Sequence, residues 1–257
     1  MAAILCAVCW HFRVQLAPLW REARVAVMPA AMQIPKPDIA RYRTLKEEAA
    51  RWRKDLARRH AKAQTTAEKK AVLKETRSFL ETVLPEMMDC WLGTPWDFHG
   101  TAEGPGQGRI ACGYFVATVL RDAGFQVDRY KLAQQPSQNI LRSFVPREAM
   151  EVKVGIPYET WAAEMRTAEP GIRIVGLDSH VAFLVTGRDG FRFIHSSGSR
   201  PWCVVNESET DAEVLRRSNY RVQGLLSSDP DLLRAWLAGK KIKVMGEGPA
   251  TASAARR

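Results

Sequence analysis

Apolar residues recur at alternating spacings of three and four from residue 42 onward, which is typical of one face of a long α-helix. Asp38 precedes this stripe and is suited to cap the helix N-terminus. The pattern breaks near residues 64–66, resumes, and ends before Pro85, so it predicts an antiparallel helical hairpin over residues 38–83. The stripe consists of Tyr42, Leu45, Ala49, Trp52 and Leu56, followed by Val72, Leu73, Thr76, Phe79, Leu80 and Val83.

A different pattern begins at Gly171, where short β-branched and aromatic runs are separated by turn residues. Runs at 172–177, 181–186 and 191–195 predict three strands, and Gly187-Arg188-Asp189-Gly190 predicts the hairpin turn between the last two. Further strands are expected at Trp202–Val205 and Tyr220–Leu225. Short helices are expected at Ser137–Phe144, Tyr158–Met165 and Leu232–Leu237. Helices first and antiparallel strands second predict an α+β fold.

These patterns divide the chain of 257 residues into four parts. Residues 1–37 are weakly patterned and contain four prolines, so we expect poor order there. The hairpin, 38–83, precedes a larger domain of mixed helices and strands at 84–245. Residues 246–257 are small and polar and predict a disordered tail.

The net charge of +10 is concentrated in the predicted hairpin. Between Arg41 and Arg77 there are 13 Lys and Arg against 5 Asp and Glu, and the rest of the chain is nearly neutral. This basic face is either a solvated helix surface or a contact for an anionic polymer. No motif that reads DNA or RNA accompanies it, so we expect no specific nucleic-acid partner.

Five cysteines, an odd and sparse set, do not form a disulfide framework. Cys6 and Cys9 form a C-x-x-C pair that lacks the further ligands of a zinc site. No motif for a cofactor is present, and no apolar run reaches the roughly 18 residues that span a membrane. Residues 2–10 are apolar but lack the positive start of a signal peptide.

Chemistry is concentrated between Gly93 and Phe115, where a glycine-rich loop leads to Cys112 and then to an apolar stripe of helical spacing. Gly124 closes this helix. A thiol at the first turn of a helix lies near unpaired backbone N–H groups and the positive end of the helix dipole. That position favours the reactive thiolate, and the same N–H groups suit an oxyanion.

His180 begins one predicted strand and His195 ends the next, so an antiparallel hairpin brings them to the same sheet edge. If the Cys112 helix packs across that edge, the three side chains form an activated nucleophile: Cys112 attacks, His180 moves the proton, and His195 orients His180. Asp178 and Asn206 are the next candidates for the orienting group. A zinc site made of Cys112, His180 and His195 is an alternative, although no fourth ligand stands out.

Four ordered motifs resemble NlpC-type cysteine peptidases, the papain-fold endopeptidases of cell walls: G-T-P-W-D-F-H-G, A-C-G-Y-F-V, S-H-V-A-F-L and F-I-H-S-S. The resemblance covers roughly Leu84 to Val205. It implies a papain-like fold with a nucleophile helix packed on an antiparallel sheet. It also implies Cys112 as nucleophile, His180 as base and His195 as the third, orienting residue.

The motifs depart from the family beside the nucleophile. Ala111 replaces an Asp, Gly113-Tyr114 replaces Ser-Gly, and His99 replaces the first glycine of a pair. Trp96 replaces a tyrosine that in the family lies near the oxyanion site. We therefore assign Trp96, Ala111, Gly113 and His99 to the oxyanion and substrate pocket.

The resemblance implies a thiol hydrolase that cleaves an amide bond in a cell-wall peptide, next to D-Glu or a diamino acid, in a secreted or periplasmic setting. An acyltransferase or a lipid-directed hydrolase on the same triad is the alternative enzyme. A binding or scaffold protein with a decayed site is the alternative outside catalysis, and the complete Cys–His–His set argues against it.

Overall fold

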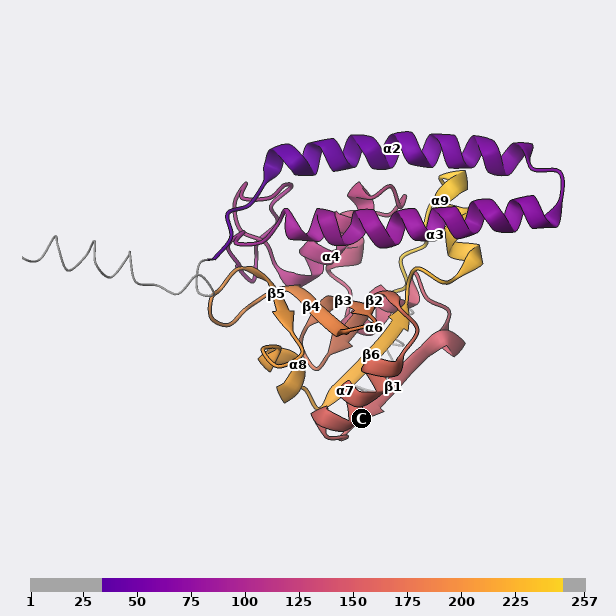
Figure 1. The fold of residues 1–257 in the computed structure, drawn as a ribbon. Helices are drawn as coiled ribbons and strands as arrows, with labels where there is room; N and C mark the ends of the chain where they lie inside the picture. Colours follow the sequence, from indigo (N-terminus) through magenta and orange to yellow (C-terminus); the bar gives the residue numbers. More distant parts are fainter. Residues whose placement is uncertain (1–33, 247–257) are drawn as a thin grey trace, which may run out of the picture. The chain divides into compact units, whose positions relative to one another are not determined.

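The computed structural model describes residues 34–246, drawn in colour in Figure 1. The predictions of a poorly ordered segment at 1–37 and of a tail at 246–257 therefore lie almost wholly outside the described residues, as do Cys6 and Cys9. The described part from Lys36 onward belongs to one compact unit.

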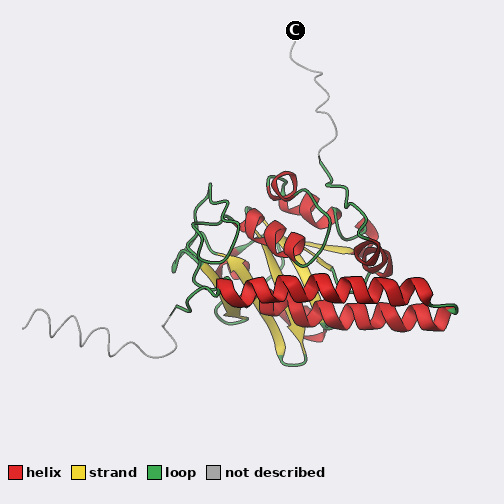
Figure 2. Ribbon diagram, turned by 90° about the horizontal axis from the view of Figure 1, so that it is seen from above, coloured by secondary structure: helices red, strands yellow, loops and turns green. Residues whose placement is uncertain are grey.

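The predicted helical hairpin is confirmed as α2 (Ile39–Lys62) and α3 (Thr66–Asp89). Asp38 caps α2 by accepting a hydrogen bond from the Arg41 amide at 2.9 Å. Thr65 and Glu68 cap α3 reciprocally, each side chain accepting from the backbone N–H of the other, which fixes the tight connection between the helices. Figures 1 and 2 show the two long helices lying side by side.

The second helix does not end before Pro85, as its pattern predicts, but passes through this proline to Asp89. A proline inside a helix removes one backbone hydrogen bond and costs about 3 kcal/mol. The residues around it, Leu84, Met87 and Met88, are completely buried, so apolar packing offsets that cost. The boundary placed between residues 83 and 84 consequently lies inside α3.

Cations of the hairpin pair with carboxylates of the same two helices. Arg59 binds Glu75 across the hairpin, and Arg41 binds Glu86 at 3.0 Å. These pairs are exposed, and exposed ion pairs typically stabilise by less than about 1 kcal/mol. They reduce the free positive charge of the surface between Arg41 and Arg77.

The remaining elements are short. The helices are α4 (Cys112–Asp122), α5 (Arg129–Ala133), α6 (Ser137–Arg142), a 3-10 turn η2 (Arg147–Ala149), α7 (Tyr158–Thr167), α8 (Glu213–Arg217) and α9 (Pro230–Ala238). The strands are β1 (Met150–Val154), β2 (Gly171–Leu177), β3 (Val181–Gly187), β4 (Gly190–Ser196), β5 (Val204–Ser208) and β6 (Tyr220–Leu225).

The six strands form one antiparallel sheet in the order β1-β6-β2-β3-β4-β5. Gly187 pairs with Gly190, which confirms the two-residue turn between β3 and β4. The strand expected at Trp202–Val205 instead begins at Val204 and runs to Ser208, because residues 199–201 turn and Trp202 takes a positive φ. β1 was not anticipated from the sequence.

Both faces of the sheet are covered. The larger apolar cluster joins one face to α4, α6 and the hairpin, with members such as Leu56, Leu80, Phe115 and Phe183. The smaller cluster packs α7 and α8 on the opposite face through Trp161, Leu215 and Phe193. The molecule is therefore an α+β fold, as predicted, and the hairpin shares its core with the helix that begins at Cys112. None of the helices in residues 34–246 has the length and apolar composition needed to cross a membrane.

Candidate active site

The glycine-rich loop folds back on itself before it enters α4. The Ile110 amide donates to the Pro95 carbonyl and the Ala111 amide donates to the Gly100 carbonyl, each at 2.9 Å. At Gly100 a Cβ atom would lie 2.5 Å from the Ile110 nitrogen, so only glycine allows this close approach. The loop thus delivers Cys112 to the start of the helix at a fixed position.

Cys112 is the first residue of α4, and the preceding N-cap position is Ala111, whose side chain cannot cap the helix. The N–H groups of the first turn therefore receive no side-chain cap, and Ala111, Cys112 and Gly113 all line a cavity. Gly113 lies against α5: a Cβ there would be 2.3 Å from the Ala133 carbonyl oxygen. Glycine after Cys112 is a packing requirement of this helix pair.

Burial raises the pKa of the Cys112 thiol, and this effect exceeds the opposing hydrogen bonds from the backbone N–H groups of Val181, Gly113 and Cys112 itself. The expectation of a stabilised thiolate is therefore wrong for the resting protein, because desolvation of a charged sulfur outweighs the helix terminus. The contact with Val181 places the sulfur at the beginning of β3, next to His180. A nucleophilic Cys112 requires a base to take its proton.

The two predicted histidines are adjacent, as the hairpin argument expected. His180 precedes β3 and His195 lies in β4, with 2.8 Å between His180 Nε2 and His195 Nδ1. His195 is completely buried, whereas His180 is partly exposed to the cavity. Burial lowers the pKa of both imidazoles to about 3, so both are neutral at physiological pH.

Glu207 extends this pair and was missed by the sequence analysis. Its Oε2 lies 3.1 Å from His195 Nε2. In the sheet, His195 of β4 pairs with Val205 of β5, so Glu207, two residues further, projects from the same face beside the imidazole. The alternation in V-V-N-E-S could have placed Glu207 on the face of His195. That inference needs the register of β5, and the strand expected at Trp202–Val205 ended before Glu207.

The other candidates for the orienting group have different partners. Asp178 accepts from the Ser218 hydroxyl and from the backbone amides of Asn219 and Tyr220. Asn206 accepts from Arg192 and donates to Asp89. Among the described residues, neither side chain hydrogen-bonds to His180 or His195.

Glu207 titrates near neutrality. Burial, and then the nearby Asp211 carboxylate, raise the pKa of Glu207 to about 7, while Arg192 acts in the opposite direction. The ionised form is acceptor-only, so it can hold a proton on His195 Nε2. The protonation state of Glu207 is therefore coupled to the tautomer of His195.

A cavity of about 850 Å³ opens beside Cys112, and both Cys112 and His180 line it. Trp96, His99, Ala111 and Gly113, the residues assigned from the sequence to the pocket, lie on its wall. Across the described residues no hydrogen bond joins the thiol to the imidazole. Such bonds often tighten only when substrate is bound.

The loop and the sheet are tied together behind the site. The buried Ser196 hydroxyl donates to the Ile110 carbonyl oxygen at 2.7 Å, joining the residue after His195 to the loop just before Cys112. The bond fixes the separation between the strand that carries His195 and the helix start that carries Cys112. His195 and Cys112 thereby share one rigid frame.

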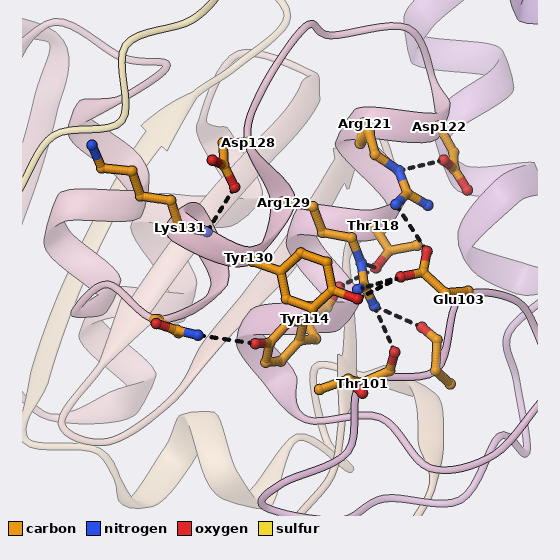
Figure 3. A network of polar contacts seen from close by, with 12 residues as sticks. Thr101, Glu103, Tyr114, Thr118, Arg121, Asp122, Asp128, Arg129, Tyr130 and Lys131 are labelled. Atoms are coloured by element: carbon orange, nitrogen blue, oxygen red, sulfur yellow. Dashed lines mark hydrogen bonds and ion pairs between the residues drawn. The ribbon is translucent and has the colours of Figure 1, made fainter.

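A buried arginine joins several elements beside the cavity, and Figure 3 shows its polar contacts. Arg129 of α5 is 3% exposed and donates to Thr118, to Glu103 and to the Thr101 and Ala102 carbonyls, at distances of 2.6–3.0 Å. All of these acceptors lie on α4 or on the glycine-rich loop. Arg129 thus joins α4, α5 and the loop beside the cavity.

The described residues contain no group of three His, Cys, Asp or Glu side chains placed to hold a metal ion. His180 Nε2 and His195 Nδ1 face each other rather than a common point, which is incompatible with the zinc alternative at these two nitrogens.

Comparison of the chain with family models, with curated proteins and with solved structures found no match in any of the three.

Proposed function

We propose that the protein is a thiol hydrolase that cleaves an amide bond through a covalent acyl-Cys112 intermediate. The observation that carries this proposal is the hydrogen-bonded series His180–His195–Glu207, which ends at a cavity that Cys112 also lines. A nucleophile, a base and groups that orient the base are the parts that acyl transfer needs. The proposed architecture is papain-like, with α4 as the nucleophile helix packed on the antiparallel sheet.

The direction of the hydrogen bonds follows from Glu207. When Glu207 is ionised it accepts from His195 Nε2–H, which leaves His195 Nδ1 as an acceptor. That acceptor requires a proton on His180 Nε2, and the remaining nitrogen, His180 Nδ1, is then free to accept a proton from the thiol. His195 and Glu207 are positioning residues, because they act through His180.

In the proposed acylation, the Cys112 proton moves to His180 Nδ1 and the sulfur forms a bond to the carbonyl carbon. The first-turn N–H groups of α4 donate to the developing oxyanion, and the Trp96 indole N–H is a further proposed donor. The C–N bond then breaks as His180 returns the proton to the leaving amine. Water attacks the thioester with His180 as base, which releases the acid and restores the thiol.

Thiol labelling tests the nucleophile and its base. Iodoacetamide should alkylate Cys112 well before Cys90 and Cys203, which are each 4% exposed, and peptide mapping by mass spectrometry identifies the modified sites. His180→Ala should slow the alkylation of Cys112, because the base is lost. Equal labelling of Cys90 and Cys112 in the folded protein would contradict the assignment.

Amide hydrolysis tests the reaction itself. Purified cell-wall peptide fragments, which the motif resemblance suggests, and simple acyl amides are incubated with the protein, and released amines are identified by mass spectrometry. Cys112→Ala should abolish release, with Cys203→Ala as the matched control. Release that survives Cys112→Ala would overturn the proposal.

A further inference from the structure

The cavity beside Cys112 has an uncharged lining. Asp, Glu, Lys and Arg make up 26% of the sequence, yet none is found among the described residues that line the cavity. A wall of average composition would contain several. The absence is therefore a property of this cavity rather than of the protein surface.

The two reacting groups in the cavity are also neutral in the resting state. Burial lowers the pKa of His180 and raises that of Cys112, so neither carries a charge at neutral pH. Glu207 lies behind His195 and does not reach the cavity wall. Backbone N–H groups of Val181, Gly113 and Cys112 are directed at the sulfur, and N–H groups at the start of a helix suit a carbonyl oxygen.

An ionic network centred on the buried Arg129 lies next to the cavity, and Figure 3 shows its contacts. The Arg129 guanidinium lies 4.9 Å from the Tyr114 ring centre and 5.1 Å from that of Tyr130. Its hydrogen bonds are made to Thr118, Glu103 and backbone carbonyls of the loop, and Arg129 itself does not line the cavity. A substrate carboxylate in the cavity would find this cation covered and already paired.

Aromatic side chains are exposed around the cavity. Phe98 lines the cavity and is 74% exposed. Trp96 also lines the cavity, and its ring centre lies 5.5 Å from that of Trp202, which is 51% exposed. Trp202 has a φ of 61°, a conformation that non-glycine residues rarely adopt, and its carbonyl accepts from the Trp96 amide at 2.8 Å. An exposed group of large apolar side chains beside a cavity is typical of a ligand site.

We propose that the acyl group held in this cavity is uncharged and apolar, an aliphatic or aromatic chain lying between Phe98, Trp96 and Tyr114. This inference rests on the proposed thiol hydrolase and defines its substrate class. A carboxylate or ammonium group next to the scissile bond would lose its water without gaining an ionic partner. The free acid and amino groups of cell-wall peptides are therefore excluded from the cavity.

A matched pair of esters tests the inference. The p-nitrophenyl esters of hexanoic acid and of hexanedioic acid have acyl chains of equal length, but the second ends in a carboxylate. We expect kcat/KM for the hexanoyl ester to exceed that for the charged ester roughly 100-fold or more, because the cavity offers the carboxylate no partner. Equal values for the two esters would overturn the inference.

A charge series at Gln134 provides a second measurement. Gln134 is exposed and lines the cavity, and its amide donates to the Tyr114 hydroxyl at 3.3 Å. Gln134→Lys should raise the charged-to-neutral ratio of kcat/KM about tenfold, and Gln134→Glu should lower it. A ratio that both variants leave unchanged would show that the acyl chain does not occupy this cavity, and would overturn the inference.

Intact-mass analysis separates this inference from the proposed function. If both esters acylate Cys112 at the same rate, the thiol mechanism holds and the apolar cavity is not selective. If neither ester acylates Cys112, or if Cys112→Ala hydrolyses both at the wild-type rate, the proposed function fails and the substrate class fails with it.

Discussion

Replacement of Glu207 by glutamine separates the positioning role from a purely structural one. Ionised Glu207 can only accept a hydrogen bond, whereas protonated Glu207 can donate to His195 Nε2 and reverse the tautomers of both histidines. His180 Nδ1 would then carry a proton and could not act as the base. We expect wild-type kcat/KM to rise with pH through about 7, following the raised pKa of Glu207. Glu207→Gln should remove this dependence, because an amide does not titrate.

The magnitude follows from the hydrogen bond that changes. A bond to a charged acceptor stabilises by about 1.5–3 kcal/mol and a neutral one by about 1 kcal/mol, so the variant loses about 0.5–2 kcal/mol of preference for the active tautomer. Above about pH 8, where wild-type Glu207 is ionised, this corresponds to a decrease in kcat/KM of about 2- to 30-fold. Near pH 6 only about a tenth of wild-type Glu207 is ionised, so the ratio of wild-type to variant kcat/KM should be roughly tenfold lower than above pH 8.

The free energy of unfolding should fall with rising pH, whereas kcat/KM should rise. The usual Glu pKa of 4.5 is raised to about 7 in the fold, so an unfolded Glu207 releases its proton at a lower pH than the folded one. The free energy of unfolding therefore falls as pH rises from about 4.5 to 7, by up to about 3 kcal/mol, since one pKa unit corresponds to about 1.4 kcal/mol. Glu207→Gln should be the more stable protein above pH 7.

Two measurements are needed: pH profiles of kcat/KM for hexanoyl ester hydrolysis, and urea unfolding at about pH 6 and pH 8.5. Glu209→Gln is the matched control, since Glu209 is also near the end of the β5 region but binds Arg166 rather than a histidine. Its pH profile should match that of the wild type. A Glu207→Gln enzyme with the wild-type acid limb and wild-type kcat/KM would refute the assignment of the tautomers.

Three further outcomes are expected. Cys112→Ala should abolish turnover and ester-dependent acylation, while circular dichroism shows that the variant is still folded. Cys203→Ala should retain both turnover and acylation. Comparable losses of activity in the two variants would contradict the assignment of Cys112 as nucleophile. His195→Ala should lower kcat on the order of 10² to 10⁴, and His195→Gln should restore part of it because the amide oxygen can accept the same hydrogen bond; wild-type turnover of the alanine variant would exclude an orienting role. Gly113→Ala should lower the free energy of unfolding by about 1–3 kcal/mol, because its Cβ would lie 2.3 Å from a carbonyl oxygen, while Gly187→Ala, which meets no atom within 4 Å, should stay within about 0.5 kcal/mol.

Local periodicity predicted the elements whose packing is simple. The hairpin, the strands around the Gly187–Gly190 turn and the helix starting at Cys112 each have a consistent period and a recognisable end signal. α3 continues beyond its expected end because the buried residues around Pro85 stabilise the helix. Such tertiary packing cannot be predicted from the local sequence. β1 was not predicted because its short run at residues 150–154 is stabilised by pairing with β6, which is distant in the sequence.

In the site, too, features set by local sequence were predicted and features set by tertiary packing were not. Placement of His180 and His195 at one sheet edge followed from the hairpin between them. The role of Glu207 depended on the register of β5, and a one-residue error in that strand turns the side chain to the other face. The charge state of Cys112 depended on burial, which arises only when α4 packs against the sheet, so the helix terminus alone gave the wrong direction for its pKa.

The bond between Ser196 and the Ile110 carbonyl has a consequence for how the protein folds. It joins a helical half, complete by about residue 122, to a sheet half that begins at residue 150, and contacts between such distant segments form late because loop closure is costly. Cys112 belongs to the first half and His180, His195 and Glu207 to the second. The site is therefore a reporter of docking between the halves: during refolding, helical signal should return before ester hydrolysis appears.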